Sequence, residues 1–296
     1  MSTAEAWTVG RLLTWTTEYL KKNGSTSPRL DAEVLLANAR NCERIELYTA
    51  FAEEPSEEVR TAFREMVRRR AEGTPVAYLV GHKEFYSMAF EVNQDVLIPR
   101  PETEHLVVEA LDRAKQLHKR EPDRALRIVD VGTGSGIIAV SLAKHLPNCK
   151  ILATDSSPAA LVVAQRNADR HRVLELLEFV QSDLLIDVAE QARFDLILSN
   201  PPYISQDEYE KLARCVRDHE PRGALVSGPK GTEIIERLIT QATDRILPGG
   251  FLIVEISPMI AVAVESLVDR RDWAAPQFIK DLAGLTRVMT AQRLIH

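Results

Sequence analysis

The chain has 296 residues, of which 45% are hydrophobic and 27% are charged. This is the balance of a folded globular protein with about two domains. The 37 Lys and Arg residues are outnumbered by 43 Asp and Glu, and the net charge of −6 argues against broad, non-specific nucleic-acid binding, though not against a local basic patch. No stretch approaches the roughly 18 uninterrupted apolar residues that a membrane span requires.

The N-terminal residues and the cysteines both point to a cytoplasmic protein. The first residues, Met1 to Glu5, lack the basic start and apolar core of a signal peptide. The three cysteines, Cys42, Cys149 and Cys215, are far apart and form no CxxC pair. They therefore indicate neither a disulfide framework nor a zinc site, and no metal site is predicted.

Apolar residues near the N-terminus recur at helical spacing and predict a small helical bundle. One helix is expected from Val9 to Leu20, ended by Asn23-Gly24. A second opens at Ser27-Pro28 and should bury Leu30, Val34, Leu35 and Leu36. A third covers Glu57 to Arg70, and its last three residues, Arg68 to Arg70, suit the helix dipole as a solvated helix end.

Gly73-Thr74-Pro75 ends the bundle, and three short strands with a hairpin among them are predicted next: Tyr78 to Val80, Lys83 to Tyr86, and Ala89 to Val92. Pro99 and Pro101 then force an extended path before a helix that begins near Glu102.

From Leu126 onward, strand and helix patterns alternate, which predicts an α/β fold with a doubly wound parallel sheet. Five apolar runs are expected as strands buried on both faces: Ile128–Val131, Lys150–Thr154, Phe179–Gln181, Phe194–Ser199 and Phe251–Glu255. The helices between them are Gly136–His145, Pro158–Arg172 and Thr232–Ile246. Two closing strands, Gln277–Asp281 and Thr286–Arg293, form a hairpin.

A glycine-rich loop, Gly132-Thr133-Gly134-Ser135-Gly136, connects the first of these strands to a helix. Glycines let the backbone approach a ligand closely and present N–H groups at the helix start. The GxGxG spacing differs from the GxGxxG of nicotinamide-binding folds. A tight turn that binds nothing is the alternative.

Two acidic residues end the next two strands. Asp155 can accept two hydrogen bonds from a ribose diol, or cap the helix that starts at Pro158, and the two roles are compatible. Asp183 is placed to meet an adenine edge, and Leu184 can pack on the ring.

The fourth strand ends in Asn200-Pro201-Pro202-Tyr203. The prolines hold the backbone extended and remove two N–H donors. The Asn200 side-chain oxygen and the Pro201 carbonyl form a pair of acceptors for a planar –NH2 group, on which Tyr203 can stack. The alternative is a proline-rich strand exit with a buried tyrosine.

The glycine loop, Asp155 and Asn200–Tyr203 resemble the S-adenosylmethionine-dependent methyltransferases of planar nitrogens, and among them the release factor glutamine N5-methyltransferases. The similarity covers most of the chain: Gly73–Leu79, Phe85-Tyr86, Leu97–Glu104, Glu220–Arg222, Leu247–Gly250 and Asp281–Gly284. Pro99–Glu104 separates the chain from the sister family that methylates a ribosomal-protein glutamine. Ser257-Pro258, where the family usually has glycine, and Leu285-Thr286, in place of a more polar pair, depart from the pattern.

The resemblance implies three parts: an N-terminal helical, substrate-recognition domain over residues 1–73, a β-hairpin linker over 74–100, and a seven-stranded Rossmann-like class I methyltransferase domain over 101–296. It implies transfer of a methyl group from S-adenosyl-L-methionine to the glutamine N5 of the Gly-Gly-Gln motif in class 1 peptide-chain release factors. The partner is then a protein substrate of translation termination, with neither a membrane nor a direct nucleic-acid substrate.

It also assigns roles to residues. Cofactor binding falls to Gly132, Thr133, Gly134, Ser135, Gly136, Asp155, Asp183, Leu184 and Asn200. Catalysis falls to Asn200, Pro201 and Tyr203, and substrate binding to these three with Pro202, Phe85, Arg100 and Glu102. Tyr203 and Phe85 would sandwich the glutamine amide, whereas Arg100 and Glu102 either border the site or anchor the linker.

Other functions remain open from the residues. An NAD-type oxidoreductase could use the same glycine loop and Asp155, but it leaves Asn200–Tyr203 unexplained. A non-catalytic adaptor could bind the cofactor without transferring the methyl group. Among enzymes, glutamine methylation of a ribosomal protein and amino-methylation of nucleic acid are the nearer alternatives, and the net charge of −6 disfavours the last.

Overall fold

The computed structural model describes residues 6–146 and 148–295, so Met1 to Glu5, used above to argue against a signal peptide, lie outside the described residues. The chain divides into two compact units. The first comprises the residues up to His82 together with Ala213–His219, and the second comprises Lys83–Leu212 and the chain from Glu220 onward. None of the helices in the described ranges is long and apolar enough to cross a membrane.

The first unit is a helical bundle, as predicted. Its helices are α1 (Val9–Lys22), α2 (Pro28–Arg40), α3 (Glu46–Thr49), α4 (Glu57–Ala71) and α5 (Val76–Val80), with α10 (Arg214–Arg217) added from later in the chain. The hydroxyls of Thr8 and Ser56 accept backbone hydrogen bonds at the starts of α1 and α4. Leu13, Leu35 and Phe63 are buried in the core that the helices share.

Two side chains of this bundle differ from the prediction. Leu30 is 46% exposed: it lies in the first turn of α2, ahead of the buried Ala32, Leu35 and Leu36. The end of α4 is not wholly solvated. Arg70 Nε donates to Asp31 Oδ2 at 2.8 Å, and both side chains are largely buried, so this ion pair ties α4 to α2.

The predicted strand at Tyr78 to Val80 is wrong: these residues belong to α5. Pro75 precedes the helix and Gly81 ends it in the left-handed conformation (φ 76°). Val76, Leu79 and Val80, at the i, i+3, i+4 positions of a helix, pack on the core of the bundle, and this packing overrides their β preference. The predicted hairpin is confirmed as β1 (His82–Phe85) and β2 (Met88–Glu91).

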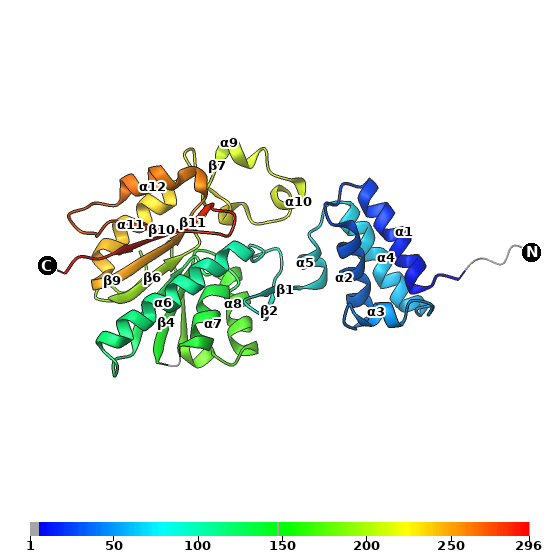
Figure 1. Ribbon diagram of the computed structural model, residues 1–296, viewed down its shortest axis with the longest axis horizontal. Coiled ribbons are helices and arrows are strands. Elements are labelled where there is room, and N and C mark those ends of the chain that lie inside the picture. The colour runs from blue at the N-terminus through cyan, green and yellow to red at the C-terminus, as the bar shows by residue number, and fades with distance from the viewer. Residues whose placement is uncertain (1–5, 147, 296) are drawn as a thin grey trace, which may run out of the picture. The chain divides into compact units, whose positions relative to one another are not determined.

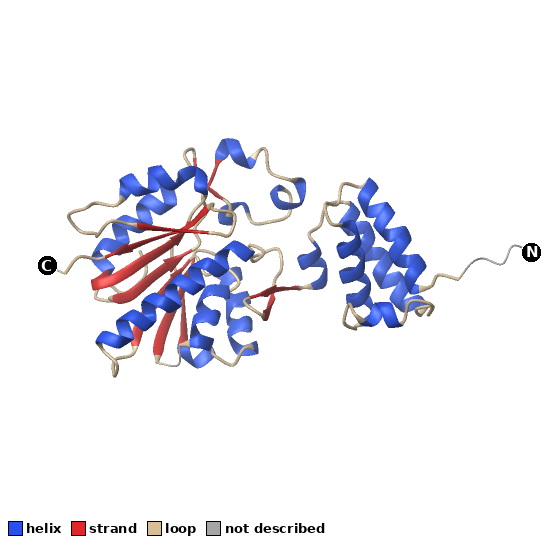
Figure 2. Ribbon diagram, in the orientation of Figure 1, coloured by secondary structure: helices blue, strands red, loops and turns tan. Residues whose placement is uncertain are grey.

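The second unit contains the predicted seven-stranded sheet, in the order β10-β11-β9-β6-β3-β4-β5 (Figures 1 and 2). The five parallel strands are β3 (Leu126–Val131), β4 (Cys149–Asp155), β5 (Leu177–Gln181), β6 (Phe194–Ser199) and β9 (Ile246–Glu255). The closing hairpin, β10 (Gln277–Lys280) and β11 (Thr286–Gln292), is antiparallel. One expectation is wrong: β5 is an edge strand and is not buried on both faces, since Glu178 and Gln181 are exposed.

Helices cover both faces of the sheet. On one face lie α6 (Glu104–Arg120), α7 (Ile137–His145) and α8 (Pro158–Arg170), and on the other α11 (Glu233–Arg245) and α12 (Ala261–Leu267) (Figure 1). Successive residues of a strand face opposite sides of the sheet and so contribute to both hydrophobic cores. Ile128 packs in the core under α6 and α7, and its neighbour Val129 packs in the core under α11 and α12. The remaining short elements are β7 (Ile204–Ser205), α9 (Gln206–Tyr209) and β8 (Val226–Gly228), which pairs with β7.

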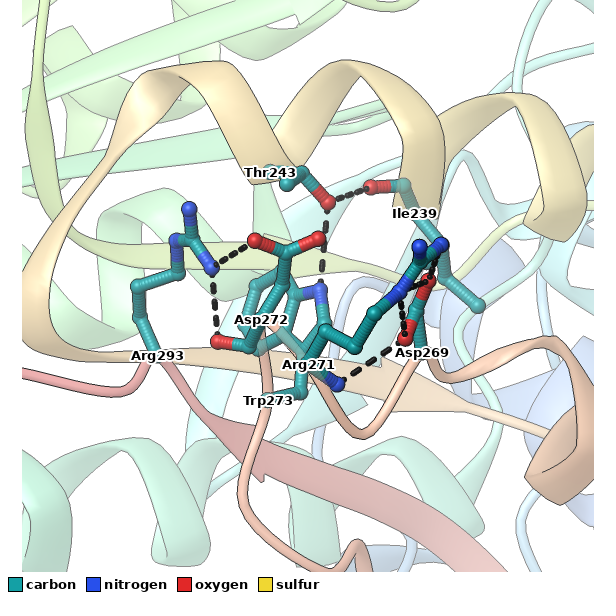
Figure 3. A network of polar contacts seen from close by, with 7 residues as sticks. All are labelled: Ile239, Thr243, Asp269, Arg271, Asp272, Trp273 and Arg293. Carbon is teal, nitrogen blue, oxygen red and sulfur yellow. Dashed lines mark hydrogen bonds and ion pairs between the residues drawn. The ribbon is translucent and has the colours of Figure 1, made fainter. Parts of the chain in front are cut away.

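The segment between α12 and β10 is fastened by a buried tryptophan (Figure 3). Trp273 is 1% exposed, and its indole N–H donates to Thr243 Oγ1 of α11 at 3.1 Å. Arg293, just after β11, donates from one guanidinium nitrogen to the carbonyl and the carboxylate of Asp272, each at 2.7 Å. Trp273 therefore links this segment to α11, and the ion pair between Asp272 and Arg293 links it to the end of the closing hairpin.

We expect Trp273→Ala to lower the free energy of unfolding by about 3–5 kcal/mol, because it removes a large buried ring and leaves a cavity. Trp273→Phe keeps most of the ring but loses the indole N–H, and should cost about 1–2 kcal/mol. Both are measured by urea denaturation. Arg271→Gln is the control, since the Arg271 side chain is 89% exposed, and it should leave the midpoint unchanged. A Trp273→Ala midpoint equal to that of the control would contradict this account.

Candidate active site

The strand order reverses beside β3, whose neighbours are β4 on one side and β6 on the other. Parallel sheets bind ligands at such a point, beyond the carboxyl ends of the strands. A cavity lies there, lined by the loops after β3, β4 and β6 and by the extended segment before α6. The predicted residues that line it are Gly132, Thr133, Gly134, Ser135, Asp155, Asp183, Leu184, Asn200, Pro202 and Arg100.

The glycine loop forms one wall of the cavity. Gly132, Gly134 and Gly136 all have positive φ, at 73°, 55° and 81°. Gly136 does not line the cavity; a Cβ there would lie 3.2 Å from the Cα of Ala164 in α8, so its role is the close packing of α7 against α8. Below the loop, Asp130 Oδ2 accepts hydrogen bonds from Thr133 Oγ1 at 2.6 Å and from Ala139 N at 3.2 Å. Burial raises the pKa of Asp130 to about 7.

Asp155 ends β4 and holds the loops on either side of it. Its Oδ2 accepts the Gly134 N–H and its Oδ1 the Ser157 N–H, both at 2.9 Å. The cap of α8 is Ser157, whose hydroxyl accepts the N–H of Ala160, so the predicted capping role does not belong to Asp155. Burial raises the pKa of Asp155, and the backbone hydrogen bonds oppose that rise. The carboxylate is thus fixed in place at the cavity wall.

Asp183 and Leu184 follow β5 on the same side of the cavity. Asp183 Oδ2 lies 2.5 Å from Arg237 Nη2 of α11, and both side chains are about half exposed. Leu184 has a positive φ of 58°, and its carbonyl accepts the hydroxyl of Thr154 at 3.2 Å. The loop is therefore held by α11 and by β4.

Asn200 and Tyr203 differ in how they face the cavity. Asn200 lines it, and its Nδ2 donates to Thr103 Oγ1 at 3.1 Å. Pro201 is buried and Tyr203 half-buried, and neither is among the lining residues. Tyr203 instead packs on the core under α11, with its hydroxyl 3.4 Å from Glu255 Oε1. Burial raises the pKa of Tyr203, so the hydroxyl keeps its proton.

Glu255, at the carboxyl end of β9, is 2% exposed. Burial raises its pKa to about 7, and the nearby Glu102 acts in the same direction. Hydrogen bonds from Thr103 and Tyr203 and the charge of Arg287 lower it. Glu255 is therefore a deeply buried acid that the Tyr203 hydroxyl contacts from the motif after β6.

The structure places the two linker residues, Arg100 and Glu102, differently. Arg100 lines the cavity and also anchors the linker, since its Nη2 lies 2.5 Å from Glu220 Oε1. The other oxygen of Glu220 accepts the N–H of Ile98 at 3.1 Å. Glu102 does not line the cavity, and its Oε1 lies 3.6 Å from Arg287 Nη2.

Phe85 is not brought to the cavity. It is 2% exposed and packs in the core under α6 and α7, with its ring 6.1 Å from that of Phe90. The alternation of the hairpin strand turns it inward, so it cannot flank a ligand beside Asn200. The predicted pairing of Phe85 with Tyr203 around an amide is therefore corrected.

The sequence agrees with this arrangement when it is compared with known proteins. Residues 11–81 match the family model described as the PrmC N-terminal domain, and residues 106–218 match the methyltransferase small domain. A release factor glutamine methyltransferase of Rhodopirellula baltica is 52% identical over 97% of both chains, and one of Koribacter versatilis is 41% identical over 93% of this chain and 95% of the relative. The chain belongs to the release factor glutamine methyltransferase family.

Membership of this family makes the chain a methyltransferase. A methyltransferase structure from Pyrococcus furiosus shares the fold, with a TM-score of 0.51 at 19% identity, over 77% of this chain and 98% of the other.

Four residues in and around the cavity had no role in the sequence analysis: Thr103, Asp130, Glu220 and Glu255. Thr103 and Glu220 lie in segments of the family resemblance, and Asp130 and Glu255 lie in predicted strands. A usable signal was the acid within or at the end of a buried strand, since Asp130, Asp155 and Glu255 all follow that pattern. The partner that each acid would meet carried no such signal.

The raised pKa of Glu255 predicts a pH dependence of stability. An acid whose folded pKa, about 7, exceeds its ordinary 4.5 favours folding fully at low pH, and this contribution is lost as the pH rises between those values. Glu255→Gln should therefore gain stability relative to wild type from pH 5 to pH 7.5, by up to about 3 kcal/mol. Asp130 titrates in both proteins and cancels.

The measurement is the difference in urea denaturation between variant and wild type across that pH range. Glu265→Gln, which replaces an exposed carboxylate on α12, is the matched control and should show no comparable gain. A difference for Glu255→Gln that is flat with pH would mean that the carboxyl is already ionised at low pH.

Proposed function

We propose that the chain transfers a methyl group from S-adenosyl-L-methionine to the side-chain nitrogen N5 of the glutamine in the Gly-Gly-Gln motif of class 1 peptide-chain release factors. The observation that carries the proposal is the side-chain amide of Asn200 in the cavity wall, next to the glycine loop and Asp155. The names of the relatives, which span nearly the whole chain, support the substrate.

The residues present fit the cofactor. Asp155 is a largely buried carboxylate at the end of β4, suited to a ribose diol, and the loop from Gly132 to Ser135 lets the backbone come close to a ligand. Asp183 and Leu184 lie where an adenine edge and ring would be met. S-adenosylmethionine supplies the activated methyl group, whose bond to sulfur breaks as the bond to the amide nitrogen forms.

On the substrate side, the task of the protein is to orient a weak nucleophile, because the lone pair of an amide nitrogen is delocalised into its carbonyl. Asn200 Oδ1, in the cavity wall, accepts one N–H of the glutamine, and the carbonyl of Pro201, the next residue along the backbone, is assigned the second N–H although Pro201 itself does not line the cavity. Two acceptors at that nitrogen also favour the positive charge that grows on it. Pro202 lines the same wall, and Tyr203 supports the motif from the core side.

The reaction releases one proton from the methylated nitrogen. An N-methylated amide cation is acidic enough to give this proton to water, so no strong general base is required. The helical unit would contact the body of the release factor, which is far larger than one glutamine side chain. The enzyme would act in the cytoplasm on a protein, without a nucleic-acid or membrane partner.

The deciding experiment incubates the purified chain with methyl-labelled S-adenosylmethionine and a class 1 release factor. We expect label on the factor and none on a copy whose Gly-Gly-Gln glutamine is changed to alanine. Label on neither, with cofactor binding shown separately by calorimetry, would contradict the proposal and favour a ribosomal protein or nucleic acid as substrate.

Asn200→Ala should reduce methyl transfer by at least about 100-fold, because it removes an acceptor aimed at the reacting nitrogen. The Kd for the cofactor should change little, since the glycine loop and Asp155 stay in place. Transfer is measured under single-turnover conditions and Kd by calorimetry. An active Asn200→Ala enzyme would exclude the hydrogen-bonding role.

Asp155→Ala should do the opposite and raise the cofactor Kd about 10-fold or more, as expected when a charge-assisted pair of hydrogen bonds is lost. The control is Asp169→Ala, which removes an exposed carboxylate on α8 and should leave Kd unchanged. Equal Kd values for the two variants would rule out Asp155 as a ribose ligand.

A further inference from the structure

The charged side chains of the cavity wall are unequal in sign. Asp95, Asp155 and Asp183 are its acids, and Arg100 is the one basic side chain among the described residues that line it. Opposite charges attract and like charges repel, so a bound ligand should carry mostly positive groups with a single negative one.

S-adenosylmethionine has this distribution of charge. Its sulfonium and its ammonium are positive, and its α-carboxylate is negative. The glutamine side chain that is proposed to accept the methyl group is uncharged, and the two glycines before it have no charged side chain. Of the two ligands proposed for this cavity, the cofactor is therefore the one that brings an anion for Arg100.

The order of the strands puts Arg100 on the side where that anion would lie. Along the edge of the sheet, Asp183 follows β5, Asp155 ends β4 and the glycine loop follows β3. A cofactor with its adenine at Asp183 and its ribose at Asp155 would have its methionyl group beyond the ribose, toward β3 and β6. The turn that follows Arg100 reaches this side, because Thr103 accepts a hydrogen bond from Asn200 after β6.

Arg100 is held by a buried acid and keeps donors for a ligand. Its Nη2 lies 2.5 Å from Glu220 Oε1, and the second oxygen of Glu220 accepts the N–H of Ile98. The Glu220 side chain is 1% exposed, whereas that of Arg100 is 32% exposed. A guanidinium has several N–H groups, and among the residues that the structure describes none accepts from Nε or Nη1 of Arg100. The cation is therefore fixed in the wall with donors still available.

We propose that Arg100 binds the α-carboxylate of S-adenosylmethionine through the guanidinium N–H groups that Glu220 leaves available. The inference rests on the proposed function, because it takes the adenine and ribose ends of the cofactor from Asp183 and Asp155. The family resemblance assigned Arg100 to substrate binding, and this inference moves it to the cofactor. The carboxylate then becomes a group by which the enzyme selects its methyl donor.

Decarboxylated S-adenosylmethionine is the probe, since it lacks the carboxylate and keeps the adenosine, the sulfonium and the amine. For wild type we expect its Kd to exceed that of S-adenosylmethionine about 10-fold or more, as when charge-assisted hydrogen bonds are lost. For Arg100→Met the two Kd values should agree within about threefold, because the carboxylate no longer has its partner. Both are measured by calorimetry, without a methyl acceptor.

Arg166→Met is the matched control. The Arg166 side chain, on α8, is 60% exposed and lies 3.1 Å from Glu91, so this variant removes an arginine–glutamate pair outside the cavity. It should keep the wild-type ratio of the two Kd values.

A second variant separates binding from folding. Arg100→Met alone leaves the buried Glu220 unpaired, which lowers stability. Combining it with Glu220→Gln removes that charge, and the glutamine oxygen still accepts the Ile98 N–H. The double variant should show the same loss of discrimination between the two compounds.

Equal Kd values for the two compounds in wild type, or a discrimination that persists once Arg100 is replaced, would overturn the inference. Wild type that binds neither compound would instead contradict the cofactor site on which both proposals rest. The expected Kd ratio without label on the release factor would contradict the proposed substrate and support this inference. The failures are therefore distinguishable.

Discussion

The parallel pairing of β4, β3, β6 and β9 brings their carboxyl ends to one edge of the sheet, and the polar groups of the cavity depend on it. Each strand end delivers one group: the glycine loop follows β3, Asp155 ends β4, Asn200 follows β6 and Glu255 ends β9. Because neighbouring parallel strands are paired in register, these groups lie side by side although they are far apart in the sequence. The hydrophobic packing of both faces fixes their spacing.

The same arrangement concentrates acids where burial is unfavourable for charge. Asp130, Asp155 and Glu255 all have raised pKa values, and in each case the first cause is burial. Each acid accepts hydrogen bonds from a segment that must stay in place: the start of α7, the glycine loop, or the Asn200 motif. The fold therefore loses some stability near neutral pH, and its loops gain fixed positions.

Local patterns predicted most of this architecture, since a buried strand, a capped helix and a glycine turn each leave a signal within a few residues. Asp155 and Asn200 were found because each directly follows a recognisable strand. Two of the errors have one cause in common, which is packing against residues outside the local pattern. Val76, Leu79 and Val80 form a helix because the bundle core lies beside them, and Phe85 faces the core under α6 and α7.

Thr103 and Glu255 show where local patterns stop being informative. The hydrogen bond from Asn200 to Thr103 spans 97 positions, and that from Tyr203 to Glu255 spans 52. A buried threonine and a buried glutamate also occur in many sites with no chemistry, so neither residue type is diagnostic.

The two contacts have in common that each reaches the motif from another element. Asn200 Nδ2 donates to Thr103 Oγ1 in the turn before α6, and the Tyr203 hydroxyl lies 3.4 Å from Glu255 Oε1 at the end of β9. Tyr203 keeps its proton because burial raises the pKa of its hydroxyl. The motif after β6 is therefore held at both ends by residues that lie far from it in the sequence, and a pattern confined to its own residues cannot reveal them.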